Sequence, residues 1–165
     1  MKKRLIVLAF ILPVMVCAGQ EKEYNGEEKE VYKVVLNVFD AMRAGDSTML
    51  GKSFMPDVQM FTATYDKEGN PILNQGNLHQ FKLAIGSPHE KIYDEPIWNT
   101  EIKIDGLLAQ VWTDYAFYLG DTFSHCGVDA FQLFKTTDGW KIFHLTDTRR
   151  RENCDIPEHI KKQKN

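Results

Sequence analysis

The feature that most constrains this chain is its final regular stretch, residues 110–148, which predicts three consecutive antiparallel strands over 110–119, 124–136 and 140–148. Gly120-Asp121 separates the first two strands, and Asp138-Gly139 separates the last two. Asp and Gly both tolerate a positive φ, so an Asp-Gly pair is a strong signal for a tight hairpin. A sheet of this kind must bury one apolar face, and the amino-terminal part of the chain has to supply the cover.

That cover is predicted to begin with an amphipathic helix of about five turns. Gly45 ends this helix, because a glycine is the usual residue just past a helix end. The apolar residues that recur with helical spacing, and so form one stripe, are Val31, Val34, Val35, Val38, Phe39 and Met42.

A second, shorter helix is predicted to start after a cap at Asp46 or Ser47. It carries Leu50 and Phe54, and Pro56 is expected to close it.

The middle of the chain predicts a strand over 58–65, a polar turn over 66–71 and a third helix over 78–85 capped by Asn77. Residues 92–104 are interpreted as a further strand, with Pro96 as a bulge or an edge feature. The order of elements predicts an α+β fold: a strongly curved antiparallel sheet with three helices on one face.

The first helix ends in Ala44-Gly45-Asp46, with Leu50, Phe54 and Asp57 leading into a strand, and the last strand opens with Asp138-Gly139-Trp140-Lys141-Ile142. In these two stretches the chain resembles nuclear transport factor 2-like domains. The resemblance covers about residues 27–150 and implies a cone-shaped sheet wrapped around three helices, with a pocket at the open end. The superfamily includes ketosteroid isomerase, scytalone dehydratase, polyketide cyclases and members that only bind or dimerise. The fold therefore does not determine the function.

The first 18 residues are predicted to be a secretory signal peptide. Lys2, Lys3 and Arg4 precede a twelve-residue apolar run over 5–16, which is too short to span a membrane. We expect an exported protein with a polar lead-in over 19–26, one domain over 27–152 and a charged tail over 153–165. The alternative is a lipoprotein anchored through Cys17, although Val16 before this cysteine is larger than such signals prefer.

Composition limits the partners and the cofactors. The whole chain has a formal net charge of −3, and loss of the three basic leader residues makes the mature chain more acidic. An acidic surface disfavours nucleic acid, whose binding depends on basic patches. The cysteines and histidines lack the spacing of a metal site, so we expect no metal and no other cofactor.

The two hairpins set a predicted register for the sheet. Two-residue turns would pair Leu119 with Thr122 and Thr137 with Trp140, and an error of one residue in either turn would exchange residues between faces. The face that this register turns inward carries Val111, Thr113, Tyr115, Phe117, Leu119, Cys126, Val128, Ala130, Gln132, Phe134, Phe143, Leu145, Asp147 and Arg149.

The polar residues of this inward face predict a ligand site. Tyr115, Thr113, Gln132, Asp147 and Arg149 would converge in an apolar cone, where they suit a small apolar or anionic ligand. Burial would raise the pKa of Asp147, whereas Arg149 would lower it, and this conflict weakens a proton shuttle on Asp147. The alternative interpretation is a structural ion pair at the sheet edge.

The opposite face predicts a partner surface. It carries Trp112, Tyr118, Phe131 and Leu133 beside charged residues, which suits a homodimer formed through the outer sheet face. An alternative polar site on this face is His125 with Asp129. The register separates His125 from His144, so the pair does not suit a metal ion.

Two cysteines remain in the mature chain, and an oxidising compartment favours a disulfide between Cys126 and Cys154. The predicted register places Arg151 opposite Cys126, so the tail must fold back over the sheet to bring the cysteines together.

The function predicted from the sequence is an exported small-molecule-binding or scaffolding domain, without catalysis. The alternatives are a small isomerase, dehydratase or cyclase that uses Asp147 or Asp129 as an acid or base in the cone, and a pure interaction module.

Overall fold

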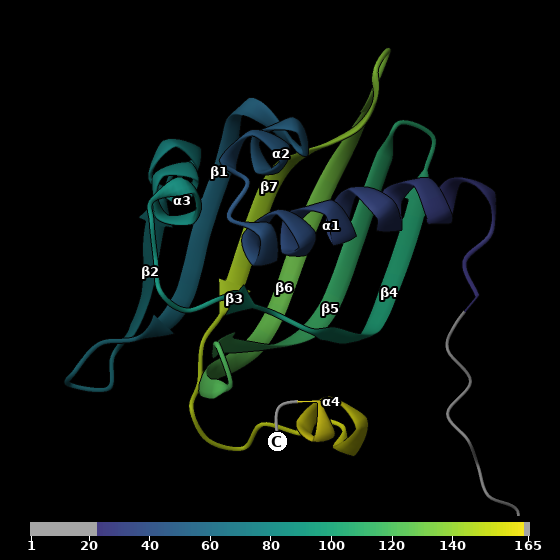
Figure 1. Ribbon diagram of the computed structural model, residues 1–165. Coiled ribbons are helices and arrows are strands. Elements are labelled where there is room, and N and C mark those ends of the chain that lie inside the picture. Colours follow the sequence, from purple (N-terminus) through teal and green to yellow (C-terminus); the bar gives the residue numbers. More distant parts are fainter. Residues whose placement is uncertain (1–22, 164–165) are drawn as a thin grey trace, which may run out of the picture.

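The computed structural model describes residues 23–163; the predicted leader, its cleavage position and Cys17 lie outside the described residues. Helices α1 (Gly26–Ala44), α2 (Ser47–Lys52) and α3 (Leu78–Gly86) cover one face of a large sheet, and a short α4 (Glu158–Lys162) follows near the carboxyl terminus (Figure 1). The predicted α+β class, with helices on a curved sheet, is confirmed. None of the described helices is long and apolar enough to cross a membrane.

The sheet is antiparallel at every strand pair except one. Its hydrogen-bonded order is β2-β1-β7-β6-β5-β3, with β4 also paired to β5, and β1 runs parallel to β7. The seven strands are β1 (Phe54–Tyr65), β2 (Pro71–Gly76), β3 (Tyr93–Asp94), β4 (Ile97–Asp105), β5 (Leu108–Leu119), β6 (Thr122–Thr136) and β7 (Gly139–Thr148).

Local sequence signals explain the helix ends. Gly45 adopts φ 67° after the last turn of α1, a conformation that costs glycine little. The Asp46 side chain accepts hydrogen bonds from the backbone amides of Thr48 and Met49 at the start of α2. Asn77 caps α3 through the amide of Gln80. The predicted helix starts at 47 and 78 are therefore produced by side-chain caps.

The core lies between the buried stripe of α1 and the inner face of the sheet. Phe39 of α1 packs edge-on against Phe131 of β6, with ring centroids 6.2 Å apart. Most of the predicted apolar stripe therefore belongs to the core. The buried residues of α1 are Val31, Val35, Val38, Phe39, Ala41 and Met42.

Three predicted boundaries are wrong. Phe54 and Pro56 belong to the start of β1 instead of the second helix. The pairing of β1 with β7 is irregular between Phe54 and Gln59, which is where a strand can accommodate a proline. Residues 71–76 form β2, a fully exposed edge strand whose side chains carry no burial pattern, and 92–104 is divided into β3 and β4 around Pro96.

The predicted register is wrong over most of β6. The hairpin at Leu119 and Thr122 forms as expected, but an irregularity beside Phe117 shifts the pairing by one residue, so Tyr115 lies opposite Gly127. The β6–β7 hairpin pairs Thr136 with Gly139, so the predicted pairing of Thr137 with Trp140 is wrong. A second irregularity beside Gln132 then places Asp129 directly opposite Asp147. Each bulge adds one residue to one strand and rotates the following side chains to the other face.

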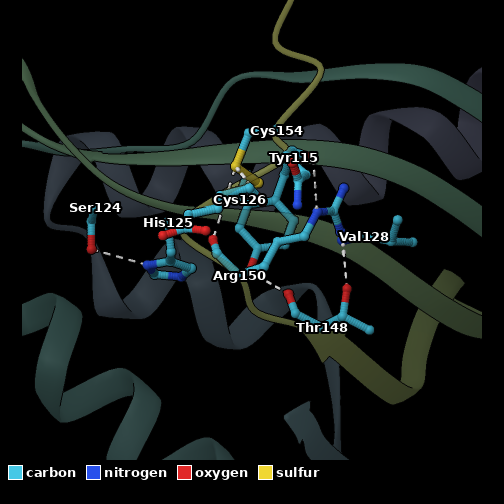
Figure 2. The surroundings of a disulfide bond; sticks show 10 residues. Tyr115, Ser124, His125, Cys126, Val128, Thr148, Arg150 and Cys154 are labelled. Carbon is cyan, nitrogen blue, oxygen red and sulfur yellow. Dashed lines mark hydrogen bonds between the residues drawn. A yellow bond between two sulfur atoms is a disulfide. The ribbon is translucent and has the colours of Figure 1, made fainter. Parts of the chain in front are cut away.

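The carboxyl-terminal tail folds back onto the outer face of the sheet. Cys126 and Cys154 form a disulfide with a Cα–Cα distance of 6.0 Å, and the backbone of Cys126 pairs with Arg150 instead of the predicted Arg151 (Figure 2). Ile156 packs beside Ala116 and Cys126. The tail therefore covers one end of the face that was predicted to be a partner surface.

Candidate functional site

A cavity of about 370 Å³ opens between the inner face of the sheet, the carboxyl-terminal end of α1 and α3. Its apolar wall comes from both helices and from the strands. The members of that wall are Val38, Phe39, Met42, Met60, Phe61, Phe81, Phe117, Phe131 and Leu145.

Six ionisable side chains reach the same cavity from the sheet side. They are Glu95, Tyr115, His125, Asp129, Asp147 and Arg149. The combination of an apolar wall with a few converging polar groups is typical of a small-molecule site.

Asp147 is held by three neighbours. Thr62 Oγ1 donates a hydrogen bond to its carboxylate at 2.6 Å, and Arg149 Nε donates another at 2.6 Å. The Tyr115 hydroxyl lies 3.4 Å from the same carboxylate and donates to the Thr148 carbonyl oxygen at 2.8 Å. Asp147 is largely buried, whereas about half of the Arg149 side chain is exposed, so the ion pair stands at the cavity rim.

Asp129 is the most deeply buried acid of the site. It is 4% exposed, and its Oδ2 has no hydrogen-bond partner among the described residues. Burial, followed by repulsion from Glu95, raises the pKa of Asp129 well above its usual value. The interaction with the Glu95 side chain also raises the pKa of Asp129, so the two buried carboxyls act as a pair.

Glu95 lies between β3 and β4 and completes the acid pair. Burial, with the charge of Asp147 as the next cause, raises the pKa of Glu95 to about 8. The sequence interpretation missed this residue. The available signal was Pro96, because a break in an edge strand can turn the neighbouring side chain toward a site. The Pro96 carbonyl accepts from the Ala116 amide, which fixes this turn against β5.

His125 contributes a neutral ring to the cavity. Its imidazole packs between the rings of Tyr115 and Phe117, with centroids 5.8 and 5.2 Å away. Its Nδ1 is 3.0 Å from Ser124 Oγ (Figure 2). Burial, with Arg149 as the next cause, lowers the pKa of His125 to about 4. Burial also raises the pKa of the Tyr115 phenol, so both rings are uncharged at neutral pH.

The structure unites two sites that the sequence interpretation kept apart. His125 and Asp129 had been placed on the outer face, but the bulge beside Phe117 turns them inward to join Tyr115, Asp147 and Arg149. The same rotation turns Gln132 outward, where it is exposed, so its inclusion in the ligand site is wrong.

Thr113 has a structural role. It is fully buried, and its hydroxyl bonds to Thr100 Oγ1 and to the Trp98 carbonyl without lining the cavity. Within residues 23–163, no three His, Cys, Asp or Glu side chains are grouped so that they could hold a metal ion.

Comparison with known proteins locates the fold. No family model matches this sequence. No curated protein matches it either. Solved structures match well: an NTF2-like protein of unknown function from Shewanella baltica aligns with a TM-score of 0.61 at 17% identity, covering 80% of this chain and 100% of that one.

Two proteins from Novosphingobium aromaticivorans give similar matches. One is an NTF2-like protein with a cystatin-like fold, with a TM-score of 0.60 at 11% identity over 77% of this chain and 84% of that one. The other is named as a candidate scytalone dehydratase, with a TM-score of 0.58 at 11% identity over 74% and 83% of the two chains. The long α1, the curved sheet and these alignments together show that this protein has the nuclear transport factor 2-like fold.

Proposed function

We propose that this protein binds a small molecule that has an apolar body and one polar head group, in the cavity between α1, α3 and the sheet. The observation that carries the proposal is the unpartnered Asp129 Oδ2, buried at the polar side of a cavity of about 370 Å³. A buried polar atom without a partner is costly, and a ligand atom that bonds to it removes that cost.

The two ends of the cavity suit the two parts of such a ligand. Aromatic and aliphatic side chains from α1, α3, β5 and β6 would cover the apolar body. The Glu95–Asp129 pair would meet the head group, while Thr62, Tyr115 and Arg149 hold Asp147 in place beside it.

A second candidate is acid–base catalysis on the bound molecule, as in an isomerase, dehydratase or cyclase. The observation that favours it is the pKa of Glu95, raised to about 8 chiefly by burial. A general acid or base works best when its pKa is near the working pH. One protein of the same fold is named as a candidate scytalone dehydratase.

A thermal-shift screen of the mature protein tests ligand binding. We expect some apolar compounds with a polar head group to raise the melting temperature of the wild type by several degrees, because a ligand at 100 times its Kd stabilises by about 2.7 kcal/mol. Asp129→Asn should show clearly smaller shifts, because it removes the carboxyl that meets the head group. Asp114→Asn, on the outer side of the neighbouring strand, makes the same chemical change and should keep them.

Absence of any hit on the wild type, or equal shifts in Asp129→Asn, would contradict the proposal. Product analysis by NMR after incubation with each hit then separates the two candidates, because only the catalytic one changes the compound.

We also propose a homodimer through the exposed part of the outer sheet face. Phe131 and Leu133 are core residues and Tyr118 is buried beside the tail, so these three no longer support the interface. Trp112 supports it: it is 48% exposed on β5.

Sedimentation velocity checks the dimer. We expect Trp112→Glu to shift the protein to a monomer with its fold retained, because a charge at the centre of an interface is left unpaired and desolvated. Leu73→Glu, at an exposed apolar position on the edge strand β2, is the control and should stay dimeric. A wild type that is monomeric at high concentration would rule the dimer out.

We also propose that the protein is exported, because residues 1–18 have the pattern of a signal peptide. The alternative proposal is a protein anchored to the membrane through a lipidated Cys17. Amino-terminal sequencing of protein recovered from cells should start near Gly19 or Gln20, and an intact Met1 would contradict both forms of the proposal.

A further inference from the structure

We propose that the head group of the ligand is a protonated amine, so that the cavity selects organic cations with an apolar body. This inference rests on the proposed small-molecule-binding function and adds the chemical class of the ligand. Four features of the cavity support it: its charges, the unpartnered atom of Asp129, its aromatic wall and its poor fit to other head groups.

The charges around the cavity are unbalanced. Three carboxyl groups line it, those of Glu95, Asp129 and Asp147, and Arg149 is the one guanidinium or ammonium group among its described lining residues. Arg149 is already engaged by Asp147 at 2.6 Å. At neutral pH the two carboxyls of the Glu95–Asp129 pair are therefore neutralised by protons, and an ammonium group could take the place of one of them.

The other groups that face the pair do not supply a cation. Tyr115 from β5 and His125 from β6 are uncharged at neutral pH, as argued above. Asp94, next to Glu95, is itself paired with Arg43 at 2.8 Å. The residues of α1 and α3 that line the cavity, Val38, Phe39, Met42, Gln80 and Phe81, carry no ionisable group.

The unpartnered Oδ2 of Asp129 specifies a hydrogen-bond donor once the carboxyl is ionised. This atom is buried, and the residue lines the cavity. An ammonium group carries three N–H donors and no acceptor, so it can bond to Asp129 and Glu95 at the same time. A bond between an ammonium donor and a carboxylate is roughly twice as strong as a neutral one.

The aromatic wall suits the same ligand. Rings of Phe39, Phe81, Phe117 and Phe131 line the cavity together with Tyr115. The face of an aromatic ring attracts a cation, and the attraction is larger in a desolvated site. The same rings bury the apolar body of the ligand.

Other head groups fit less well. A carboxylate would be repelled by Asp147 and would have to compete with it for Arg149. A neutral hydroxyl or carbonyl group could bond to the protonated Glu95–Asp129 pair, but the carboxyl proton would then stay on the protein. Binding of an ammonium ion differs because the carboxyl proton must leave: the amine enters as R–NH₃⁺, the pair ionises, and the released proton passes to the buffer.

Matched ligand triples test the inference. The probes are tryptamine, tryptophol and indole-3-acetic acid, with 4-phenylbutylamine, 4-phenylbutanol and 4-phenylbutyric acid as a second skeleton. Isothermal titration calorimetry at pH 7, in two buffers of different ionisation enthalpy, measures affinity and proton release together. We expect the amine to bind at least about tenfold more tightly than the alcohol, the acid to bind most weakly, and only the amine to release protons.

Variants locate the effect. Asp129→Asn should bring the ratio of amine to alcohol affinity close to one and abolish proton release, whereas Asp114→Asn should leave both unchanged. An alcohol or acid that binds as tightly as its amine, or an unchanged ratio in Asp129→Asn, would overturn the amine assignment while ligand binding stands. Hits that appear only among non-amines in the thermal-shift screen would also overturn it, and a screen without hits overturns the proposed function itself.

Discussion

The stability of the wild-type protein is expected to fall as the pH rises from about 6.5 to about 8, and Glu95→Gln is expected to remove much of that fall. Glu95 keeps its proton in the folded state up to a pKa of about 8, because burial and Asp147 disfavour its charge. In the unfolded chain the same carboxyl ionises near its ordinary value of 4.5.

The sign follows from proton binding. Between these two pKa values the folded state holds more protons than the unfolded state, so stability decreases with increasing pH. The contribution of Glu95 is complete below about pH 4.5 and is lost as the pH rises through about 8. Each pH unit in this window corresponds to about 1.4 kcal/mol, so the full effect is on the order of 5 kcal/mol.

His125 opposes this trend in the acidic part of the window. Its pKa is lowered from 6.5 to about 4, so below pH 6.5 the unfolded chain binds the extra proton and stability rises with pH. The two slopes oppose each other between about pH 4.5 and 6.5. The decrease caused by the carboxyl pair is therefore seen most clearly above pH 6.5.

Urea unfolding between pH 4.5 and 9 measures this profile. Glu95→Gln should be more stable than the wild type at pH 8 and should reveal the rise caused by His125 below pH 6.5. Glu101→Gln, at an exposed position of β4, is the control. A wild-type profile that is flat above pH 6.5, or a variant with an unchanged slope there, would show that Glu95 is not held protonated.

Replacement of Gly127 by alanine is expected to destabilise the fold by about 3 kcal/mol or more, because atoms forced together in a packed interior require the backbone to move. A Cβ at this position would lie 1.8 Å from the Thr148 carbonyl oxygen and 2.8 Å from Tyr115 Cε1. Thr148 O is also the acceptor of the Tyr115 hydroxyl, so the movement would disturb the residues around Asp147.

Gly76→Ala provides a matched control. Gly76 also lies on a strand, but a Cβ there would meet its nearest neighbour at 3.8 Å, an ordinary contact. Thermal and urea unfolding of both variants compare the two positions. A Gly127→Ala protein as stable as Gly76→Ala would show that β6 and the end of β7 do not approach so closely in solution.

Much of the fold follows from local sequence signals. The stripe of α1, the caps at Asp46 and Asn77 and the Asp138-Gly139 hairpin each depend on neighbouring residues, and each appears close to its expected position. The weakly patterned segments were harder to predict. Strand β2 is exposed along its whole length, so it lacks the alternation of buried and exposed residues that identifies a strand.

The candidate site was only partly predictable. Asp147 and Arg149 are two residues apart in the chain, so the two-residue period of a strand places both side chains on the same face of the sheet. Tyr115 was predicted on the same inward face, so these three residues could be grouped without knowledge of the fold. The inward position of Asp129 needs the bulge beside Phe117, and its position opposite Asp147 needs the irregularity beside Gln132. A bulge depends on how neighbouring strands bend and pack, and the residues within it carry no distinct signal.

The sequence by itself therefore determined the helices, their caps and the approximate positions of the β5–β6 and β6–β7 hairpins, because these depend on contacts between near neighbours in the chain. Only the tertiary structure decided which strands' inner faces meet: it turned Asp129 and His125 into the cavity, turned Gln132 out of it and brought Glu95 to Asp129 across 34 residues of chain. The acid pair exists because long-range packing buries two carboxyls together, and a one-residue shift of register would separate them.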